Sequence, residues 1–583
     1  MKDDNEWRTA ADTQYTLGMT YRNTSTGDQQ ANLEQAIACF QRALNLYSLQ
    51  TTPIEWARTQ QQLGMAYRGL MHDRQQYLSK ALAAFQASLE VFTSEEYAVD
   101  RAQTQYELAL TYLQMLGSNR RPLLFKALAC LQSCLEVYTF ERFPEPWAQT
   151  QYNLGNLYCL LPTDDRYATL RKAVACYESA LRVYTPESAP EEWAMTQYSL
   201  ANVYAFLPGG ERQTNLERSI THYQAALQVN TYELHPDLWA NTMQSMGNAY
   251  RNMPGDESEA SLHHAVDCYQ AALSIYTREH MPLDWASIYT NLGITYNLMS
   301  SGNEQSRLEQ AVVCFRAALE VYTREFYPSE WAKTTNMLGL TYLDMPEGNE
   351  QSQLRQAIIC FEAVLDIYTF AQHPLAWANV HYNLGHVYLL VQPKDNQEQQ
   401  ANLQKAIISF ESALQVYNRK DTPYEWARTQ SNLGNAYKDV HSDDPELHLQ
   451  QALSCYRAAL LVYARENMQD EWAATQGNLG QTYWKLARGT HQGYLERAIA
   501  SFEESLQIQT YETALLEWSQ NKYFLGQSYA NLTRGDQQHN IRQALACYEA
   551  ALRGFQALHL PVQIQDVQQH IQQARESLSR DLA

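Results

Sequence analysis

The chain has 583 residues, of which 64 are acidic and 43 basic, and its formal net charge is −21. This charge argues against nucleic acid and anionic membranes as partners, because both are bound through basic surfaces. Hydrophobic residues make up 45% of the sequence, which is enough for a packed core. The N-terminal residues contain no secretory signal, and no apolar run reaches the length of about 18 residues that spans a membrane. We therefore expect a cytoplasmic protein.

A repeated segment runs through the chain. The sequence PLDWASIYTNLGITY (residues 282–296) recurs as PSEWAKTTNMLGLTY (328–342) and as PLAWANVHYNLGHVY (374–388), in steps of 46 residues. A tryptophan marks the same slot in most repeats: Trp56, Trp147, Trp193, Trp239, Trp285, Trp331, Trp377, Trp426, Trp472 and Trp518. Repetition at a fixed period is typical of solenoid proteins.

The tryptophan slots define the organisation of the chain. Ala10 and Arg101 fill the slot in two repeats, and Ile564 lies in register after the last repeat. The spacing predicts twelve repeats over residues 1–560 and a single capping helix over residues 561–583. The step from Trp377 to Trp426 is 49 residues, and we assign its three extra residues to a loop between two helices.

Each repeat contains two amphipathic segments, which we call helix A and helix B. In helix A, Trp285, Leu292 and Tyr296 share one helical face, and in helix B the apolar stripe includes Phe315. Helix A nearly always has a glycine after the leucine, such as Gly293, which lets the partner helix approach closely. A proline three residues before the tryptophan suits the first turn of helix A, and a loop glycine suits a helix C-cap.

The pattern L-G-x-x-Y in helix A followed by A-x-x-x-F/Y-x-x-A-L in helix B resembles the tetratricopeptide repeat, and the resemblance covers essentially the whole chain. It implies an all-α fold, a right-handed solenoid superhelix of antiparallel helix pairs whose A helices line a concave groove. It also implies that the groove binds a partner peptide or domain. The repeat departs from the family in its length of about 46 residues instead of 34. Such elongated repeats resemble bacterial arrays that are often fused to signalling or effector modules, and this sequence contains no such module.

The sequence contains no recognisable reactive site. Eight of the ten cysteines occupy one position, directly before the central apolar residue of helix B: Cys39, Cys130, Cys176, Cys268, Cys314, Cys360, Cys455 and Cys547. Stacked repeats would place these cysteines about 10 Å apart, whereas disulfides need Cα atoms within about 7 Å. We interpret them as small buried side chains. No zinc, phosphate-binding, dinucleotide or hydrolase motif is found, and we expect no metal, no cofactor and no enzymatic activity.

The candidate binding residues lie on helix A. Counted from the tryptophan slot as position 0, positions 2, 5, 6, 9 and 12 lie away from the core stripe or at its margin. Tyrosines at position 5 and asparagines at positions 6 and 9 offer hydrogen bonds and rigid contact area to a peptide. With the basic residues at positions 2 and 12, the predicted peptide-binding groove comprises Arg58, Arg68, Tyr106, Tyr152, Asn153, Asn156, Tyr198, Asn202, Asn248, Asn291, Tyr382, Asn383, Arg428, Asn432, Asn435, Lys438, Asn478 and Trp484.

Each of these features has a structural alternative. The tyrosines and asparagines can instead bond to neighbouring helices and keep the repeats in register. The basic residues near the two ends, such as Arg68 and Lys438, can clamp a carboxylate in the resembled family, or they form a solvated basic patch. Trp484 is an exposed contact residue in one interpretation and packs against the next repeat in the other.

Three functions remain open at this stage. The first is a scaffold or adaptor that holds a protein partner in the groove. The second is a self-assembling structural protein, and the third is a sensor segment for a fused or separately encoded effector. The polar segment 561–583 resembles a solvating cap, whereas the N-terminal end has no equivalent cap helix. We therefore expect a monomer or a homodimer formed through the N-terminal end.

Overall fold

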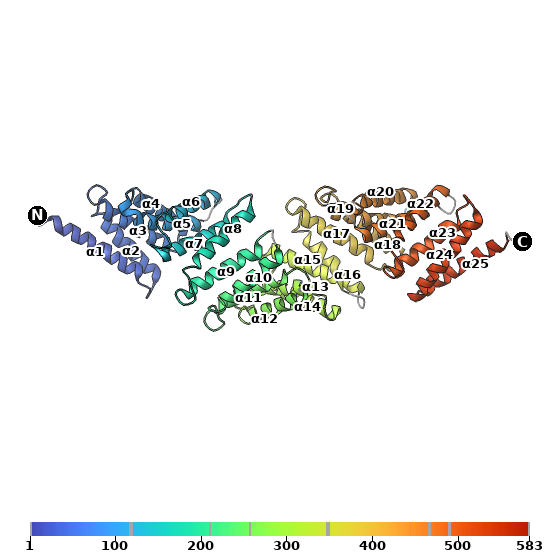
Figure 1. Ribbon diagram of the computed structural model, residues 1–583, viewed down its shortest axis with the longest axis horizontal. Helices are drawn as coiled ribbons and strands as arrows, with labels where there is room; N and C mark the ends of the chain where they lie inside the picture. The colour runs from blue at the N-terminus through green and yellow to red at the C-terminus, as the bar shows by residue number, and fades with distance from the viewer. Residues whose placement is uncertain are drawn as a thin grey trace. The chain divides into compact units, whose positions relative to one another are not determined.

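The computed structural model describes residues 3–115, 120–208, 211–255, 258–345, 350–441, 444–464, 468–487 and 491–580. The chain divides into two compact lobes, the N-terminal lobe Met1–Asn291 and the C-terminal lobe Leu292–Ala583. The regular structure of the described residues is helical throughout, and their 25 α-helices follow one another as pairs (Figure 1).

In the N-terminal lobe the helices are, in chain order, α1 (Asp3–Asn23), α2 (Gln29–Leu44), α3 (Pro53–Gly69), α4 (Arg74–Leu89), the short 3₁₀ helix η1 (Glu95–Tyr97), α5 (Ala98–Gln114), α6 (Arg120–Cys134), α7 (Pro144–Leu160), α8 (Arg166–Ala180), α9 (Pro190–Phe206), α10 (Arg212–Ala226), α11 (Pro236–Arg251) and α12 (Ser258–Ala272). Helix α13 (Pro282–Leu298) contains the boundary between the lobes.

In the C-terminal lobe the order continues with α14 (Glu304–Leu319), α15 (Pro328–Asp344), α16 (Glu350–Val364), α17 (Pro374–Leu390), α18 (Asn396–Ala413), α19 (Pro423–Asp439), α20 (Pro445–Tyr463), α21 (Gln469–Ala487), α22 (Gln492–Ser505), α23 (Leu515–Ala530), α24 (Gln537–Ala557) and α25 (Pro561–Arg580). Odd-numbered helices up to α23 are the predicted A helices, and even-numbered helices are the B helices. The pairing ends with the single helix α25.

Helix A and helix B of one repeat touch through glycine and an aromatic ring. A Cβ atom at Gly155 would lie 2.6 Å from Cε1 of Tyr177, and one at Gly385 would lie 2.7 Å from Cε1 of Phe410. Both distances are shorter than van der Waals contact allows. Glycine in helix A therefore permits the close approach of the two helices, as the sequence predicts, and the ring of helix B fills the space.

Successive repeats are joined by the tyrosine at position 11 of helix A, whose hydroxyl reaches helix B of the preceding repeat. The hydroxyl of Tyr388 donates to Glu362 at 2.8 Å, and that of Tyr437 donates to a second helix B carboxylate at 2.7 Å. In α25, Arg575 stands at position 11 and donates to Glu549 at 2.9 Å. The final helix therefore keeps the contact with a different side chain.

Helix termini and cysteines also follow the sequence interpretation. Proline occupies the first turn of A helices such as α7 and α17, and Gly302 has φ of 83° in a loop between two helices. Within the described residues, the ten cysteines are free thiols and most are buried. Burial raises the pKa of Cys314 to about 12, which keeps this thiol protonated and unreactive at neutral pH.

The three extra residues of the 49-residue step lie in a helix, and the assignment to a loop is wrong. Helix α18 begins at Asn396, seven residues before Leu403, whereas α8 begins only four residues before the equivalent Leu170. The connection before α18 keeps the ordinary length. The extra residues add a turn at the N-terminal end of α18. Because they precede the apolar stripe of that helix, the spacing within the stripe does not change.

Candidate functional site

Many of the predicted groove residues hold neighbouring repeats together. Asn153 donates through Nδ2 to the hydroxyl of Tyr106 at 2.8 Å, and Asn432 donates in the same way to Tyr382 at 2.9 Å. The hydroxyl oxygens of Tyr152 and Ser199 are 3.4 Å apart, which is a longer version of the same contact. A position 5 tyrosine thus pairs with position 6 of the next helix A.

The asparagines at position 9 pair within their own repeat. Each accepts a hydrogen bond from the tyrosine of helix B: Tyr177 to Asn156 (2.7 Å), Tyr223 to Asn202 (2.6 Å), Tyr269 to Asn248 (2.8 Å) and Tyr456 to Asn435 (2.7 Å). Where helix B has phenylalanine at this place, position 9 is usually apolar, as with Phe40 and Met19. These asparagines therefore satisfy a buried hydroxyl.

The predicted basic residues of the N-terminal lobe form ion pairs. Arg58 Nε lies 3.1 Å from Asp100 Oδ1, and Arg68 Nη2 lies 2.6 Å from Glu107 Oε2. Asn291 accepts from Arg251 Nη1 at 2.7 Å. Each basic side chain reaches the next helix A, so these residues again connect neighbouring repeats.

The remaining predicted residues lie in the C-terminal lobe. The guanidinium of Arg428 lies 4.1 Å from the centre of the Tyr382 ring, and Asn383 is half-buried on α17. Trp484 is also half-buried, with its ring centre 5.1 Å from that of Phe524 in the next helix A. It thus packs against the next repeat, and it also lines another cavity together with Gln527 and residues of α25.

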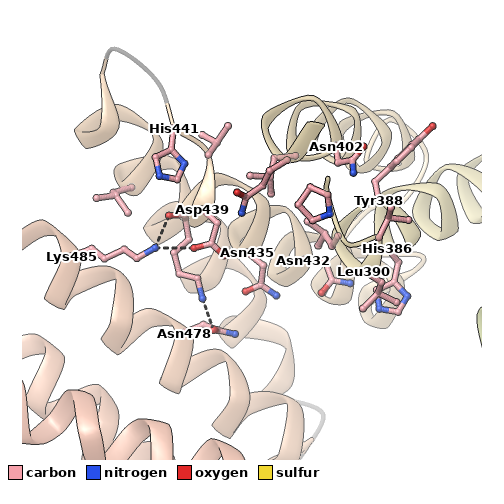
Figure 2. A pocket seen from close by; sticks show the side chains of 18 of the residues that line it. His386, Tyr388, Leu390, Asn402, Asn432, Asn435, Asp439, His441, Asn478 and Lys485 are labelled. Atoms are coloured by element: carbon pink, nitrogen blue, oxygen red, sulfur yellow. Dashed lines mark hydrogen bonds and ion pairs between the residues drawn. The ribbon is translucent and has the colours of Figure 1, made fainter. Parts of the chain in front are cut away.

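A cavity of about 800 Å³ in the C-terminal lobe brings four predicted residues together. Asn432, Asn435, Lys438 and Asn478 line it, and its walls come from α17 to α21 (Figure 2). Further polar residues line it as well: His386, Tyr388, Gln399, Asn402, Asp439, His441 and Lys485. The remaining walls are largely apolar side chains of α17, α18 and α20. This cavity is our candidate functional site.

Lys438 is the central charge of the cavity. Its ammonium donates to Asn478 Oδ1 at 2.9 Å and to Gln481 Oε1 at 3.2 Å, both neutral amides. Burial lowers the pKa of Lys438, and the nearby Lys485 lowers it further, whereas Asp439 opposes both effects. Asp439 forms its own ion pair with Lys485 at 2.8 Å. The cavity thus has an acidic partner for one of its two lysines.

The two histidines of the cavity differ in their surroundings. Burial lowers the pKa of His386, and the positive charge of Arg428 lowers it further. His386 is therefore a neutral imidazole at pH 7, able to donate through one nitrogen and accept through the other. His441 follows α19, where Gln400 bonds both its backbone N–H (2.7 Å) and its Nδ1 (2.9 Å).

The lengthened helix α18 changes the wall of the cavity. In α24, Asn540 Nδ2 donates to the carbonyls of Leu532 (3.0 Å) and Arg534 (2.9 Å), which closes the preceding loop. Asn402 occupies the equivalent place in α18, but the added turn separates it from its loop. Its Nδ2 is buried and has no acceptor among the described residues. An amide donor is therefore left unpaired at the cavity wall.

Two signals in the sequence point to the cavity residues that the predicted groove did not include. His386 and Gln481 are polar at position 9 although helix B of their own repeats has Phe410 and Phe502, which have no hydroxyl to satisfy. The 49-residue step lies in the same place. Departures from the repeat pattern, more than the pattern itself, therefore mark the cavity. Among the described residues, no cluster of metal-ligating side chains was found, and no helix is long and apolar enough to cross a membrane.

Comparisons with known proteins were made for the sequence and the structure. The family model of the soluble NSF attachment protein, SNAP, matches residues 390–572, which include most of the cavity. No curated protein matches the chain. The repeat pattern of the sequence and the helix pairs of the described residues are similar to those of tetratricopeptide solenoids. The predicted all-α architecture of repeated helix pairs is thus confirmed.

Solved structures similar to this solenoid match over most of its length at low identity. They include Cut9 in the APC/C hetero-tetramer Cut9–Hcn1 (15% identity, 90% of this chain, 87% of that chain, TM-score 0.34). Yeast Tom70 has 14% identity, with 89% and 96% covered and a TM-score of 0.30. The tetratricopeptide domain of P58(IPK) has 11% identity, with 76% and 99% covered and a TM-score of 0.23.

Proposed function

We propose that this solenoid is a protein-binding scaffold and that the α17–α21 cavity receives an acidic segment of its partner. Tetratricopeptide-like solenoids generally mediate protein–protein interactions. The observation that carries the proposal is the lysine pair of the cavity. Lys438 contacts neutral amides, whereas Lys485 pairs with Asp439, the one carboxylate among the described residues that line the cavity. On a chain of net charge −21, this is a local site for a negative group.

The chemistry of the walls fits a carboxylate attached to a peptide. The ammonium of Lys438 supplies a point charge, and the asparagine amides and neutral His386 supply hydrogen bonds to a peptide backbone. Apolar residues such as Val440 and Leu449 offer contact to the partner's side chains. A cavity that combines apolar walls with a few convergent polar groups is typical of a binding site.

A quantitative pull-down tests the proposal. The full chain serves as bait, and recovered proteins are compared between wild type and Lys438→Met, which keeps most of the length of the side chain and removes its charge. Arg251→Met is the matched control, because Arg251 also stands at position 12 and also bonds a neutral asparagine of the next repeat. We expect a partner that is lost with Lys438→Met and retained with Arg251→Met. Equal recovery by both variants would contradict the proposed site.

A peptide array made from the recovered partner then tests the chemistry. Peptides with free carboxylates should bind several-fold more tightly than the same peptides with amides in their place, and the difference should vanish in Lys438→Met. Binding that does not depend on the carboxylates would overturn the acidic-segment proposal but leave the scaffold function intact.

The assembly state is a separate proposal. We propose that the chain is a monomer or a dimer formed through its N-terminal end, and light scattering after size exclusion distinguishes the two. Trp7 is half-buried near this end, where it packs with Tyr47 and Trp56. A dimer that dissociates when residues of α1 are replaced would support the N-terminal contact, whereas open-ended polymers would favour a self-assembling protein.

A further inference from the structure

One repeat of the N-terminal lobe lacks an aromatic ring that most other repeats have. Three or four residues after the end of helix B there is a tyrosine in the preceding repeat (Tyr184) and in the following one (Tyr276), and a phenylalanine at Phe92. Here the residue is Asn230, in the sequence VNT, whereas the preceding repeat reads VYT. The Tyr276 hydroxyl donates to the backbone carbonyl of Asp237 at 3.3 Å. The equivalent carbonyl, 46 residues earlier, belongs to Glu191.

A cavity of about 350 Å³ occupies the place of the missing ring. It lies between α9 and α11, and Glu191, Glu192, Met195, Tyr198 and Leu238 line it together with Asn230. The side chain of Asn230 is 6% exposed, and its amide makes no hydrogen bond to a described residue. The cavity thus contains a buried polar group without a partner.

The walls of the cavity differ in chemistry. The α9 side carries the carboxylates of Glu191 and Glu192, neither of which forms an ion pair with a described residue. The α11 side carries Leu238, at a position where other repeats usually have an acidic residue, and Leu238 is 51% exposed. Met195 is also largely exposed, and Tyr198 presents an aromatic wall whose hydroxyl is already bonded to Ser245 at 3.1 Å.

We propose that this cavity binds a basic side chain, arginine in preference to lysine, of a protein partner. The aliphatic stem of such a side chain packs on Met195 and Leu238. Its guanidinium reaches the two carboxylates and the Asn230 amide oxygen, and it stacks on the Tyr198 ring. Arginine is favoured because its planar group bonds several acceptors at once. That the source is a protein rests on the proposed scaffold function, whereas the cationic chemistry does not.

The binding experiment uses single capped amino acids, so it is independent of the partner pull-down. Saturation-transfer NMR with N-acetyl-arginine methylamide and the full chain is run at pH 8. This pH lies above the ordinary histidine pKa of about 6.5, so that positively charged histidines do not compete with the probe. The comparison probe is the citrulline analogue, which has nearly the same shape and no charge. We expect binding of the arginine probe and, because charged hydrogen bonds are lost, about ten-fold weaker binding of the citrulline probe.

Three variants decide whether the probe occupies this cavity. Asn230→Tyr restores the residue of the neighbouring repeats, and it should abolish binding while the chain stays folded by circular dichroism. The double variant Glu191→Gln, Glu192→Gln should weaken binding about ten-fold or more. Glu233→Gln, an exposed carboxylate that does not line the cavity, should leave binding unchanged.

Several outcomes would overturn the inference. Equal binding of the arginine and citrulline probes would remove the role of charge, and unchanged binding by Asn230→Tyr would remove the cavity. Tighter binding of agmatine, a free amine with the same head group, than of the capped arginine would make the natural ligand a small amine instead of a peptide. A different outcome separates the two proposals: arginine binding without any effect of Lys438→Met on partner recovery would sustain this site and reject the α17–α21 site.

Discussion

Two stretches of the solenoid, α3–α12 in the N-terminal lobe and α17–α21 in the C-terminal lobe, use the same positions of helix A in different ways. In α3–α12, Arg68 finds a carboxylate in Glu107, and the position 9 asparagines find tyrosine hydroxyls. In α17–α21, the hydrogen bonds of Lys438 to described residues go to the neutral amides of Asn478 and Gln481, and His386 stands opposite a phenylalanine. The first arrangement uses polar side chains to join helices, whereas the second leaves charge and hydrogen-bonding capacity in a cavity.

This difference shows that the polar residues at equivalent positions of successive A helices do not all have one role. Some bind neighbouring helices, whereas others are available to a ligand. Each side chain must be compared with the partner that its own repeat and the next repeat offer. Where an acceptor matches a donor, the residue contributes to cohesion between helices. Where the partner is missing, the residue is available to a ligand, and the cost of burying it is offset only when the ligand binds.

The largest expected effect tests the matched side of the comparison. Glu107→Ala removes the carboxylate that pairs with Arg68, whose side chain is only 22% exposed. We expect the free energy of local unfolding to fall by about 3 kcal/mol. Asn478→Ala, at the same position in the C-terminal lobe, should cost about 1 kcal/mol. Hydrogen exchange of α3–α6 and α19–α22 measures both. Equal losses would show that the two stretches are not held differently.

The tyrosine–asparagine contact gives the next largest effect. Tyr177→Phe leaves the Asn156 oxygen without its donor, and we expect a loss of about 1–2 kcal/mol in the protection of α7 and α8. Adding Asn156→Met should recover part of it, because Met19 and Phe40 occupy these two places in the first repeat. A double-mutant cycle measures the coupling, and strictly additive losses would contradict the assigned role.

The lowered pKa of Lys438 predicts a dependence of stability on pH. Between this folded-state pKa and the ordinary value of about 10.4, the unfolded chain binds the extra proton, so stability rises with pH by at most about 1.4 kcal/mol per unit. Below the folded-state pKa the full penalty of burying the charge applies. Hydrogen exchange of α19–α21 over this range measures the rise after correction for intrinsic exchange rates.

Two variants check the origin of that rise. Lys438→Met should lack it, whereas Arg251→Met should keep it, because arginine stays charged throughout. If stability rises equally with pH in wild type and Lys438→Met, the rise comes from other titrating groups. Lys438 would then lie in a more solvated site.

The smallest effect concerns the unpaired amide of the cavity. Asn402→Ala should change stability by less than about 0.5 kcal/mol, because the lost Nδ2 has no acceptor among the described residues. Asn540→Ala removes two good hydrogen bonds at the equivalent place and should cost about 1–2 kcal/mol. Thermal shifts of the two variants measure the contrast. A larger cost for Asn402 would mean that it closes its loop after all.

The repeat pattern predicted the helices well because their physical causes are local. The glycine–aromatic contact, as at Gly155 and Tyr177, and the proline at the start of helix A depend on residues within one repeat or its neighbour. Both could be read from spacing alone. The same pattern also predicted Lys438 and three asparagines of the cavity, since these stand at defined positions of helix A.

The pattern could not separate binding residues from joining residues, because the next helix A covers much of the surface that one helix seems to expose. Tyr198 and Asn153 appear free on a single helix, yet each bonds a neighbouring helix A 43 to 47 residues away. Asn402 and His441 were missed because they lie outside the A helices, in α18 and in the segment after α19. Their contribution depends on how three helices surround one space.

The single asparagine at position 230 has a consequence for how a protein of this kind changes over time. Ten of the twelve repeats have an aromatic residue at this place, and the two exceptions are Asn230 and Gln509. At Asn230 the missing ring leaves a cavity. The loss of one ring weakens the packing only of its own repeat and the adjacent ones, because each repeat contacts only its neighbours. The substitution at this place can therefore open a recess in one repeat while repeats farther along the chain keep their own packing.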